Sequence, residues 1–154
     1  MKTEDPFKDA TIIDCRVPAD ELYYSIPTNE IPKYNKFKFG VVFIVKRECA
    51  PKITELAATR AGVRVSREMS IGEKELFEVQ RSAIIKDLLA KHGQLDKGTL
   101  PDEDYKQNTD AIANRDDEGL PTRIFSTYDV DGVAVWVITE VDESQTTILL
   151  PSEY

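Results

Sequence analysis

The sequence contains little of what cofactor-binding proteins and most enzymes require. Among its 154 residues are one histidine, two cysteines and seven glycines. No two glycines stand two positions apart, so the chain has neither the Gly-x-Gly turn of dinucleotide-binding proteins nor a Gly-Lys-Ser/Thr phosphate loop. The Gly-x-Ser-x-Gly nucleophile elbow is missing too, and one histidine cannot form a histidine-rich metal site. We therefore expect no cofactor, although carboxylate metal sites stay open.

Long hydrophobic runs and export signals are also lacking. The longest apolar stretches, such as residues 40–45, have the length of a strand and are far shorter than a membrane span. The first residues, Met-Lys-Thr-Glu-Asp-Pro, contain no apolar signal-peptide segment. Cys15 and Cys49 lack the spacing of metal ligands, which favours reduced thiols. These features predict a cytoplasmic protein that does not bind membranes.

Positive charge is scarce. The formal net charge is −8, with 41% hydrophobic and 31% charged residues, as in an ordinary soluble globular domain. General binding to nucleic acid is disfavoured, because phosphate contacts need clustered Lys and Arg. Basic residues concentrate in residues 33–52 and acidic ones in residues 102–118. Either both are solvated surfaces or the acidic run steers a partner. The binding candidates in this run are Asp102, Glu103, Asp104, Asp116, Asp117 and Glu118.

The length of the chain is that of a single domain. Residues 1–36 indicate a loosely structured wrap around a core of residues 37–154, because Pro18, Pro27 and Pro32 interrupt regular structure in residues 16–36. Within the wrap we expect a short strand at residues 11–15 and a short helical turn near residues 19–24. Residues 37–45 begin by alternating and become continuously apolar, which predicts a strand near the middle of a sheet.

Three helices are predicted after that strand. Pro51 suits a first helical turn and Gly62 ends this helix; residues 63–65 follow as a brief strand. Ser70 and Glu73 form a capping box that opens a longer helix, ending at His92-Gly93. The apolar stripe expected to face the core consists of Leu76, Phe77, Val79, Ala83, Ile84 and Leu88. The third helix spans residues 102–114, with carboxylates in its first turn.

The last third of the chain predicts three strands joined by two tight turns. Asp131-Gly132 lies between two β-rich runs, which is the pattern of a type I′ hairpin. After it, Val133, Val135, Val137, Thr139 and Val141 alternate with Ala134, Trp136, Ile138 and Glu140. Because both sets are largely apolar, this strand should lie inside the sheet. The predicted fold class is α+β: a mixed or antiparallel sheet with a C-terminal three-stranded meander, packed by two or three helices.

Two local patterns have both a structural and a chemical interpretation. His92 could act as a general base, but its place before Gly93 favours a helix-end cation, with Gly93 supplying a left-handed cap. The segment Asp129-Val-Asp-Gly132 is similar to the start of a calcium loop, yet the later ligands of such a loop are missing. A hairpin turn is therefore the favoured interpretation.

Polar residues gather at the predicted strand ends. Glu140, Asp142 and Glu143 could hold Mg²⁺ or perform acid–base chemistry. Since Glu140 alternates in phase with Trp136, the alternative is a partly buried carboxylate paired with Arg123. Glu140 and Asp142 are the weak catalytic candidates. The candidate binding residues at the strand ends are Arg123, Tyr128, Glu140, Asp142, Thr146 and Thr147.

From about Leu88 onward the chain follows a recurring pattern. Its parts are Leu89-x-x-His92, Glu103-Asp104-x-x-x-Asn108, Arg123-Ile-x-Ser-x-Tyr128, Trp136-x-Ile-Thr-Glu-x-Asp142 and Thr146-Thr-x-Leu-Leu-Pro-x-x-Tyr154. In these residues the chain resembles a family of short proteins carried by plasmids, phages and integrated elements. Members bear names such as "plasmid-related protein" or "type I restriction endonuclease subunit M". The resemblance implies a protein of a mobile genetic element.

Two features separate this chain from those names and from the family pattern. The methyltransferase name does not transfer, because the chain lacks the Asn/Asp-Pro-Pro-aromatic motif that grips a flipped base and a glycine-rich loop for the methyl donor. The family usually has Arg where this chain has Glu143. A contact made by that Arg with a phosphate or an acidic partner would be lost or reversed here.

Three functions remain open from the sequence. The first is a non-enzymatic accessory protein of a phage or plasmid, which binds a protein partner and modulates a host defence system such as restriction or CRISPR. In one version its acidic run imitates the charge of DNA. The second is a small carboxylate- or metal-dependent hydrolase or nuclease that uses Glu140, Asp142 and either Asn108 or Arg123. The third is a homo-oligomeric scaffold, in which residues 33–52 of one subunit meet the acidic run of another.

Overall fold

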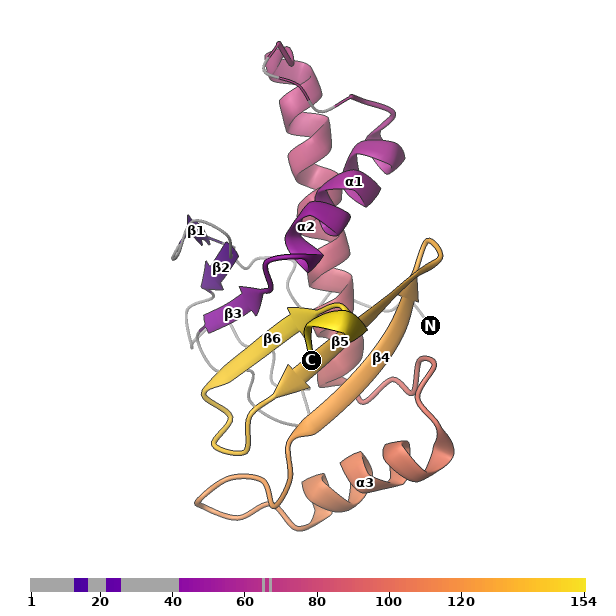
Figure 1. Cartoon of the computed structure of the whole chain (residues 1–154). Coiled ribbons are helices and arrows are strands. Elements are labelled where there is room, and N and C mark those ends of the chain that lie inside the picture. The colour runs from indigo at the N-terminus through magenta and orange to yellow at the C-terminus, as the bar shows by residue number, and fades with distance from the viewer. Residues whose placement is uncertain (1–12, 17–21, 26–41, 65, 67) are drawn as a thin grey trace, which may run out of the picture.

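Figure 1 shows the computed structural model of the chain, which describes residues 13–16, 22–25, 42–64, 66 and 68–154. In this part of the chain, six strands form one sheet in the order β1-β2-β3-β6-β5-β4. The strands are β1 (Ile13–Arg16), β2 (Leu22–Ser25), β3 (Val42–Val45), β4 (Ile124–Val130), β5 (Val133–Thr139) and β6 (Gln145–Leu149). The helices are α1 (Cys49–Ala61), α2 (Ile71–Gly93) and α3 (Asp102–Ala113), and the short 3₁₀ turn η2 covers Pro151–Glu153. The predicted α+β fold with a C-terminal meander is confirmed.

The sheet is mixed. β4, β5 and β6 pair antiparallel as the predicted meander, whereas β3 runs parallel to β6. Because β2 pairs with its other edge, β3 lies inside the sheet, as its apolar sequence predicts; residues 37–41 of that predicted strand lie outside the described part. The short strand expected near residues 11–15 appears as β1.

The helical turn expected near residues 19–24 is wrong for the residues that the structure describes. Leu22, Tyr23 and Tyr24 are extended in β2, where they pair with β3 on one side and β1 on the other. Tyrosine is a residue that favours strands, and the ladder on both sides satisfies the backbone groups. Residues 19–21 and most of the predicted wrap lie outside the described residues.

The two faces of the meander follow the predicted alternation along β5. Val135 and Val137 belong to the core cluster that contains the buried side chains of α1 and α2. Figure 1 shows the C-terminal half of α2 behind the sheet and α1 packed along α2 above it, while η2 lies in front of the sheet. Trp136, between the two valines, points to the front and meets the ring of Tyr154, which directly follows η2. One face of the sheet is therefore closed by helices, as expected.

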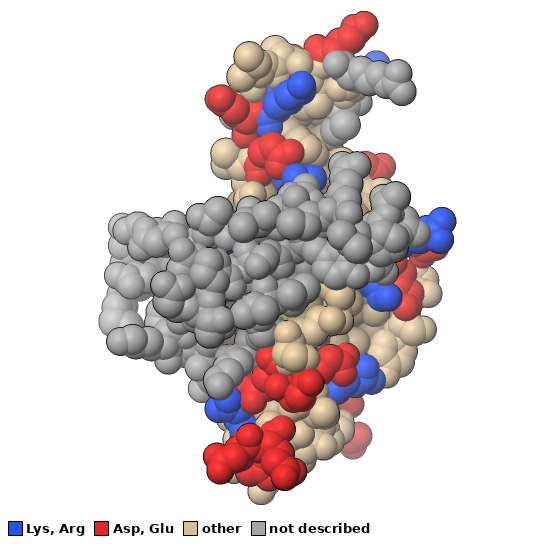
Figure 2. All heavy atoms as spheres, turned by 90° about the vertical axis from the view of Figure 1, so that its left-hand side faces the viewer, with Lys and Arg blue, Asp and Glu red and all other residues tan. Residues whose placement is uncertain are grey.

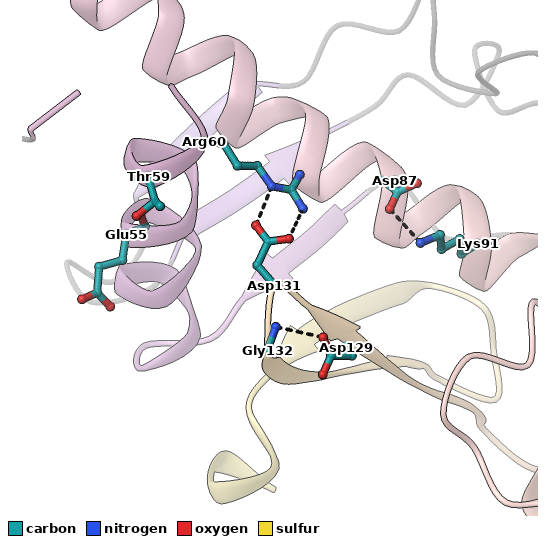
Figure 3. A network of polar contacts seen from close by, with 8 residues as sticks. All are labelled: Glu55, Thr59, Arg60, Asp87, Lys91, Asp129, Asp131 and Gly132. Atoms are coloured by element: carbon teal, nitrogen blue, oxygen red, sulfur yellow. Dashed lines mark hydrogen bonds and ion pairs between the residues drawn. The ribbon is translucent and has the colours of Figure 1, made fainter. Parts of the chain in front are cut away.

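The β4–β5 turn has the predicted hairpin geometry and is tied to α1. Asp131 (φ 52°) and Gly132 (φ 89°) both have the positive φ that a type I′ turn requires. The Asp131 carboxylate accepts two hydrogen bonds from Arg60 in the last turn of α1, over 2.7 and 3.0 Å, as Figure 3 shows. The Arg60 guanidinium lowers the pKa of this carboxyl. The segment is therefore a hairpin turn, as favoured above, and its Asp131 carboxylate binds Arg60.

Helix starts and stops largely follow the sequence. Gly62 ends α1 with φ 68°, and the capping box of α2 is present, since Ser70 Oγ accepts from Glu73 N–H and Glu73 Oε1 from Ser70 N–H. α3 begins and ends within one residue of the prediction. The brief strand predicted at residues 63–65 does not form at residues 63 and 64, and residue 65 lies outside the described part.

The predicted apolar stripe of α2 is partly wrong. Phe77, Ile84 and Leu88 are buried, but Leu76 is 56% exposed and Val79 63% exposed, and Ala83 is exposed as well. Figure 1 gives the reason: the N-terminal half of α2 extends beyond the sheet, where α1 packs along one side. A single neighbouring helix covers a narrow face, so the residues on the far side stay in solvent.

α2 ends at Gly93, as predicted, but the predicted left-handed cap at Gly93 is wrong. The left-handed residue after the helix is Leu95 (φ 55°), not Gly93. Gly93 is buried and follows a histidine that is held by hydrogen bonds in the interior, so the helix continues through both residues. The buried side chain of Leu95 offsets the cost of the left-handed conformation.

Candidate functional site

The polar residues of the meander form two groups, one on each face of the sheet. On the face of α1 and α2, His92 lies at the centre of a buried hydrogen-bond network. On the front face, Arg123 and Trp136 line an open pocket next to α3. Both groups contain residues of the C-terminal strands, so this segment combines two features with different chemistry.

The His92 network crosses all three strands of the meander. His92 is fully buried; its Nδ1 lies 2.7 Å from Ser126 Oγ on β4, and its Nε2 lies 2.9 Å from Thr139 Oγ1 on β5. Thr139 Oγ1 is in turn 2.7 Å from Thr146 Oγ1 on β6. One side chain of α2 therefore connects to β4 and β5 directly and to β6 through a threonine.

The charge state of His92 follows from its burial. Loss of hydration lowers its pKa from 6.5 to about 3, because the charged imidazolium is disfavoured in the core. The predicted helix-end cation is thus wrong, and the ring is neutral at pH 7. A neutral imidazole has one donor and one acceptor nitrogen, and hydroxyls can serve either. With no exposed surface on His92, the network stabilises the core and is closed to a substrate.

The pocket on the front face is the candidate binding site. Its volume is about 360 Å³, and we call it the Trp136 pocket. Strand residues and Tyr154 contribute apolar and aromatic surface, and α3 contributes polar groups. The residues that line it are Asp104, Gln107, Asn108, Thr122, Arg123, Phe125, Trp136, Ile138 and Tyr154.

Asn108 attaches α3 to the edge of the sheet and so builds one wall of the pocket. Its Nδ2 donates to the Phe125 carbonyl over 2.6 Å, and its Oδ1 accepts from the Phe125 N–H over 3.1 Å. A side-chain amide thus takes the place of a neighbouring strand on β4, which is the last strand of the described sheet. Thr99 N–H likewise donates to the Thr127 carbonyl over 3.0 Å. These contacts satisfy edge groups that would otherwise favour pairing with another chain.

Three aromatic rings stand edge to face in the pocket. Phe125 and Trp136 have ring centroids 4.8 Å apart at an interplanar angle of 90°, and Trp136 and Tyr154 have centroids 5.5 Å apart at 64°. Edge-to-face pairs of this kind hold rings in defined orientations. The sole tryptophan of the chain is therefore fixed between two other rings, with part of its surface exposed to the pocket.

Arg123 is placed next to these rings by Tyr154. Its Nη2 donates to Tyr154 Oη over 2.8 Å, and its guanidinium carbon lies 5.7 Å from the centroid of the Tyr154 ring. Glu140 Oε1 lies 3.8 Å from Arg123 Nη1, with side chains 41% and 43% exposed respectively. The predicted Arg123–Glu140 ion pair is present, but its separation is too long for a hydrogen bond.

The position of Tyr154 depends on contacts between η2 and the start of α1. Glu153 Oε2 accepts from the Glu48 N–H over 2.7 Å, and Glu153 Oε1 accepts from the Leu150 N–H over 2.9 Å. A carboxylate at the N-terminal end of a helix is favourably placed relative to the helix dipole. Glu153 thereby holds the turn that carries Tyr154 to the rim of the pocket.

The other predicted strand-end residues form contacts within the chain. Tyr128 is buried and donates from its hydroxyl to the Asp96 carbonyl over 3.0 Å; burial raises its pKa. Thr146 belongs to the His92 network, and Thr147 Oγ1 accepts from the Gln145 side chain over 3.3 Å. Asp142 accepts from the hydroxyl and the N–H of Ser144, which lowers the pKa of its carboxyl.

The side chain of Glu143 lies inside the protein. It adopts φ 57° in the β5–β6 turn, and its side chain is 5% exposed. Its Oε2 accepts from Arg115 Nε over 2.8 Å, which connects this turn to the loop after α3. In this chain the position serves an internal ion pair.

The acidic candidates lie on the surface at the end of the molecule that contains α3. Figure 2 shows Asp and Glu side chains gathered at the lower end, at the height of α3 in Figure 1. Asp102, the first residue of α3, pairs with Lys97 over 2.7 Å, which lowers the pKa of its carboxyl. Asp104 lines the Trp136 pocket. The remaining exposed members are Glu103, Asp116, Asp117 and Glu118.

Sequence reasoning did not assign several residues that build these two sites. Ser126 and Thr139 occupy alternating positions on the side of their strands that faces the helices. These positions could have indicated that both hydroxyls are buried and hydrogen-bonded. Phe125 and Trp136 were in phase with the opposite face. Nothing in the sequence indicated that Asn108 pairs with β4, because that contact depends on how α3 packs.

Metal ligands, thiols and membrane spans give no further site among the described residues. That part of the chain contains no group of three or more His, Cys, Asp and Glu side chains placed to hold a metal ion. Cys49 is a buried free thiol whose pKa is raised to about 12 by burial. None of the helices that the structure describes is long and apolar enough to cross a membrane.

The chain matches no protein-family model, no curated protein and no solved structure.

Proposed function

We propose that this chain is a binding protein that engages a protein partner through the Trp136 pocket. The observation that carries the proposal is an open pocket in which Trp136, Tyr154 and Arg123 lie together. These three residue types dominate the binding energy of protein interfaces, because they offer large, rigid contact surfaces with one polar end. Both partners of each aromatic pair are already oriented, so little side-chain freedom is lost on binding.

The hydrogen bonds and the burial of the candidate catalytic residues favour a binding function over hydrolysis. Asn108 uses both ends of its amide on the backbone of Phe125. Asp142 accepts two hydrogen bonds from Ser144, and the single histidine is buried in its network. A catalytic acid or base needs access to the reacting group. Asn108 and His92 use their polar atoms on contacts inside the protein, and Asp142 uses its carboxylate on the turn that contains Ser144.

The resemblance and the charge suggest what kind of partner to expect. The C-terminal pattern is similar to that of proteins from phages and plasmids, which supports a role as an accessory protein of a mobile element acting on a host defence system such as restriction or CRISPR. The net charge of −8 and the acidic surface beside α3 favour attraction to a basic protein surface. Imitation of DNA charge is the sharper version of this proposal.

The test is recovery of a partner from a host lysate by the tagged protein, at low and at moderate salt. Gln107→Arg places a bulky side chain at an exposed position of the pocket, and we expect it to abolish recovery. Ala113→Arg adds the same charge at an exposed position of α3 that does not line the pocket, and it should leave recovery intact. Recovery of no stoichiometric partner, or equal loss in both variants, would argue against the proposal.

A further inference from the structure

Among the described residues, no anion is hydrogen-bonded to the guanidinium of Arg123. Its hydrogen bond in the structure goes to the neutral hydroxyl of Tyr154, whereas an arginine has five N–H donors. The carboxylate that approaches it among the described residues, Glu140, stays 3.8 Å from Nη1. Some of the N–H donors of this planar guanidinium, which form a fork that can bind a planar anion through two hydrogen bonds, are therefore still available.

Tyr154 orients that fork beside the pocket. It binds Arg123 in two ways, through its hydroxyl and through the face of its ring. Tyr154 is itself positioned by the Trp136 ring and by the anchoring of η2 at Glu153. A guanidinium with a fixed plane loses less freedom on binding than a mobile one, which favours bidentate contact with a carboxylate.

The surroundings of the fork suit a carboxylate attached to an apolar stem. Phe125, Trp136 and Ile138 give apolar surface directly next to Arg123 in the pocket lining. Such surface binds methylene or aromatic groups and lowers the effective dielectric around the charge. A phosphate would be less well matched, because it carries more charge into a pocket that also contains the Asp104 carboxylate.

Asp104 determines which side of the pocket an anion can occupy. It lies in the first turn of α3, one helical turn before Asn108, whereas Arg123 precedes the β4 residue that Asn108 binds. An anion is repelled by Asp104 and attracted by Arg123, so it should enter on the side of β4's first residues. A hydrogen-bond donor or a cationic group of the same ligand can instead lie next to the Asp104 carboxylate.

We propose that the Trp136 pocket binds an aspartate or glutamate side chain of the partner protein, with the carboxylate bound by Arg123 and the adjoining stem lying on Trp136 and Phe125. This inference rests on the proposed function, since it names the group that the partner inserts. It also gives Glu140 a role: its carboxylate competes with the incoming one for the same guanidinium.

The test uses a matched pair of small probes, 3-phenylpropanoate and its uncharged amide, with the full chain. The fluorescence of Trp136, the single tryptophan, reports occupancy of the pocket. At constant ionic strength we expect the carboxylate to bind at least about tenfold more tightly than the amide, and Arg123→Gln to remove this preference. Arg123→Lys should retain part of it, because the charge remains while the fork is lost.

Two further variants separate a specific contact from charge and from misfolding. Glu140→Gln removes the internal competitor and should tighten binding of 3-phenylpropanoate several-fold, a gain that a misfolded protein cannot imitate. Lys106→Gln changes the net charge by the same amount as Arg123→Gln but lies outside the Trp136 pocket, so it should leave the preference unchanged. Equal binding of both probes, no binding of either, or equal effects of Arg123→Gln and Lys106→Gln would overturn the inference.

The two proposals fail in different ways. If the lysate partner is lost with Gln107→Arg while the probes bind equally, the pocket binds protein but not through a carboxylate. If the chain prefers 3-phenylpropanoate over its amide while no protein is recovered, the pocket binds carboxylates and the proposed protein-binding function is contradicted. The probe titration and the lysate experiment therefore report on the two statements separately.

Discussion

At the scale of single residues, His92 shows most clearly how position changes chemistry. Its ordinary pKa of 6.5 would make it a proton donor or acceptor near neutral pH, yet burial lowers that pKa to about 3. The ring is held by Ser126 and Thr139 as a neutral hydrogen-bonding group. The same residue is therefore a stability determinant whose contribution depends on pH.

We predict that acid destabilises the protein through His92. Between pH 6.5 and pH 3 the unfolded chain binds a proton at this residue and the folded chain does not, so the free energy of unfolding falls as the pH falls through this window. The contribution is complete above about pH 6.5. Its slope is at most about 1.4 kcal/mol per pH unit.

Chemical denaturation of the wild type and of His92→Gln from pH 4 to pH 7 measures this effect. The carboxyl groups titrate in both proteins, so the difference between the two curves isolates the histidine. Parallel curves over the whole range would contradict a neutral, buried His92.

A second residue-scale prediction concerns two glycines with opposite requirements. Gly119 has φ 124°, and a Cβ there would lie against the Val141 carbonyl oxygen. Gly72, in the first turn of α2, has ordinary helical φ and open space around it. We expect Gly119→Ala to cost more than about 1 kcal/mol of stability and Gly72→Ala to add up to about 1 kcal/mol. Thermal and urea unfolding compare the pair, and a similar sign for both would contradict the structure.

At the scale of elements, the attachment of α3 to β4 decides whether the pocket exists. α3 has carboxylates in its first turn and few apolar residues to bury. Asn108 compensates by pairing with both backbone groups of Phe125. Its 3% exposure makes these bonds valuable, because the groups left behind would be poorly solvated.

Replacing Asn108 by alanine should therefore lower stability by about 1–3 kcal/mol and speed hydrogen exchange of the Phe125 amide. The freed edge of β4 should also increase self-association at high concentration. The control is Gln107→Ala, one residue earlier on the exposed side of α3, which should change stability by less than about 0.5 kcal/mol. Unchanged exchange at Phe125 in Asn108→Ala would show that α3 is held by other contacts.

Element-scale features differ in how well the sequence predicts them. The Asp131-Gly132 turn, the Ser70–Glu73 capping box and the bounds of α3 depend on local geometry, and all were predicted correctly. The buried face of α2 depends on which neighbours reach it. Leu76 and Val79 have the spacing of core residues but are exposed, since the N-terminal half of α2 extends beyond the sheet. Periodicity identifies a helix and does not show how far its partner extends.

At the scale of the whole molecule, the buried core and the proposed binding pocket lie on opposite faces of the meander. Side chains of β5 alternate between the helix-covered core and the Trp136 pocket. Period-two alternation allows both in the same seven residues. A change on one face should therefore affect one property and leave the other.

We predict that Ser126→Ala and Arg123→Gln have opposite profiles. Ser126→Ala removes a hydroxyl from buried His92 and should cost about 1–3 kcal/mol of stability while probe binding below the unfolding midpoint is retained. Arg123→Gln alters a half-exposed side chain and should change stability by less than about 0.5 kcal/mol while abolishing the preference for the carboxylate. Urea unfolding measures the stability of both variants, and the fluorescence titration measures their probe binding. If either variant changed stability and probe binding to the same extent, the two faces would be coupled.

The sequence by itself determined the α+β class, the three C-terminal strands with their turn, and the helix termini, because each of these depends on residues close together in the chain. It also indicated Arg123 and Glu140 as neighbours, since adjacent strands bring their ends together. Tertiary structure alone decided that His92 is neutral, that Asn108 closes the sheet edge and that Trp136, Tyr154 and Arg123 form one pocket. Each of these depends on desolvation or packing between segments distant in sequence, which no local pattern encodes.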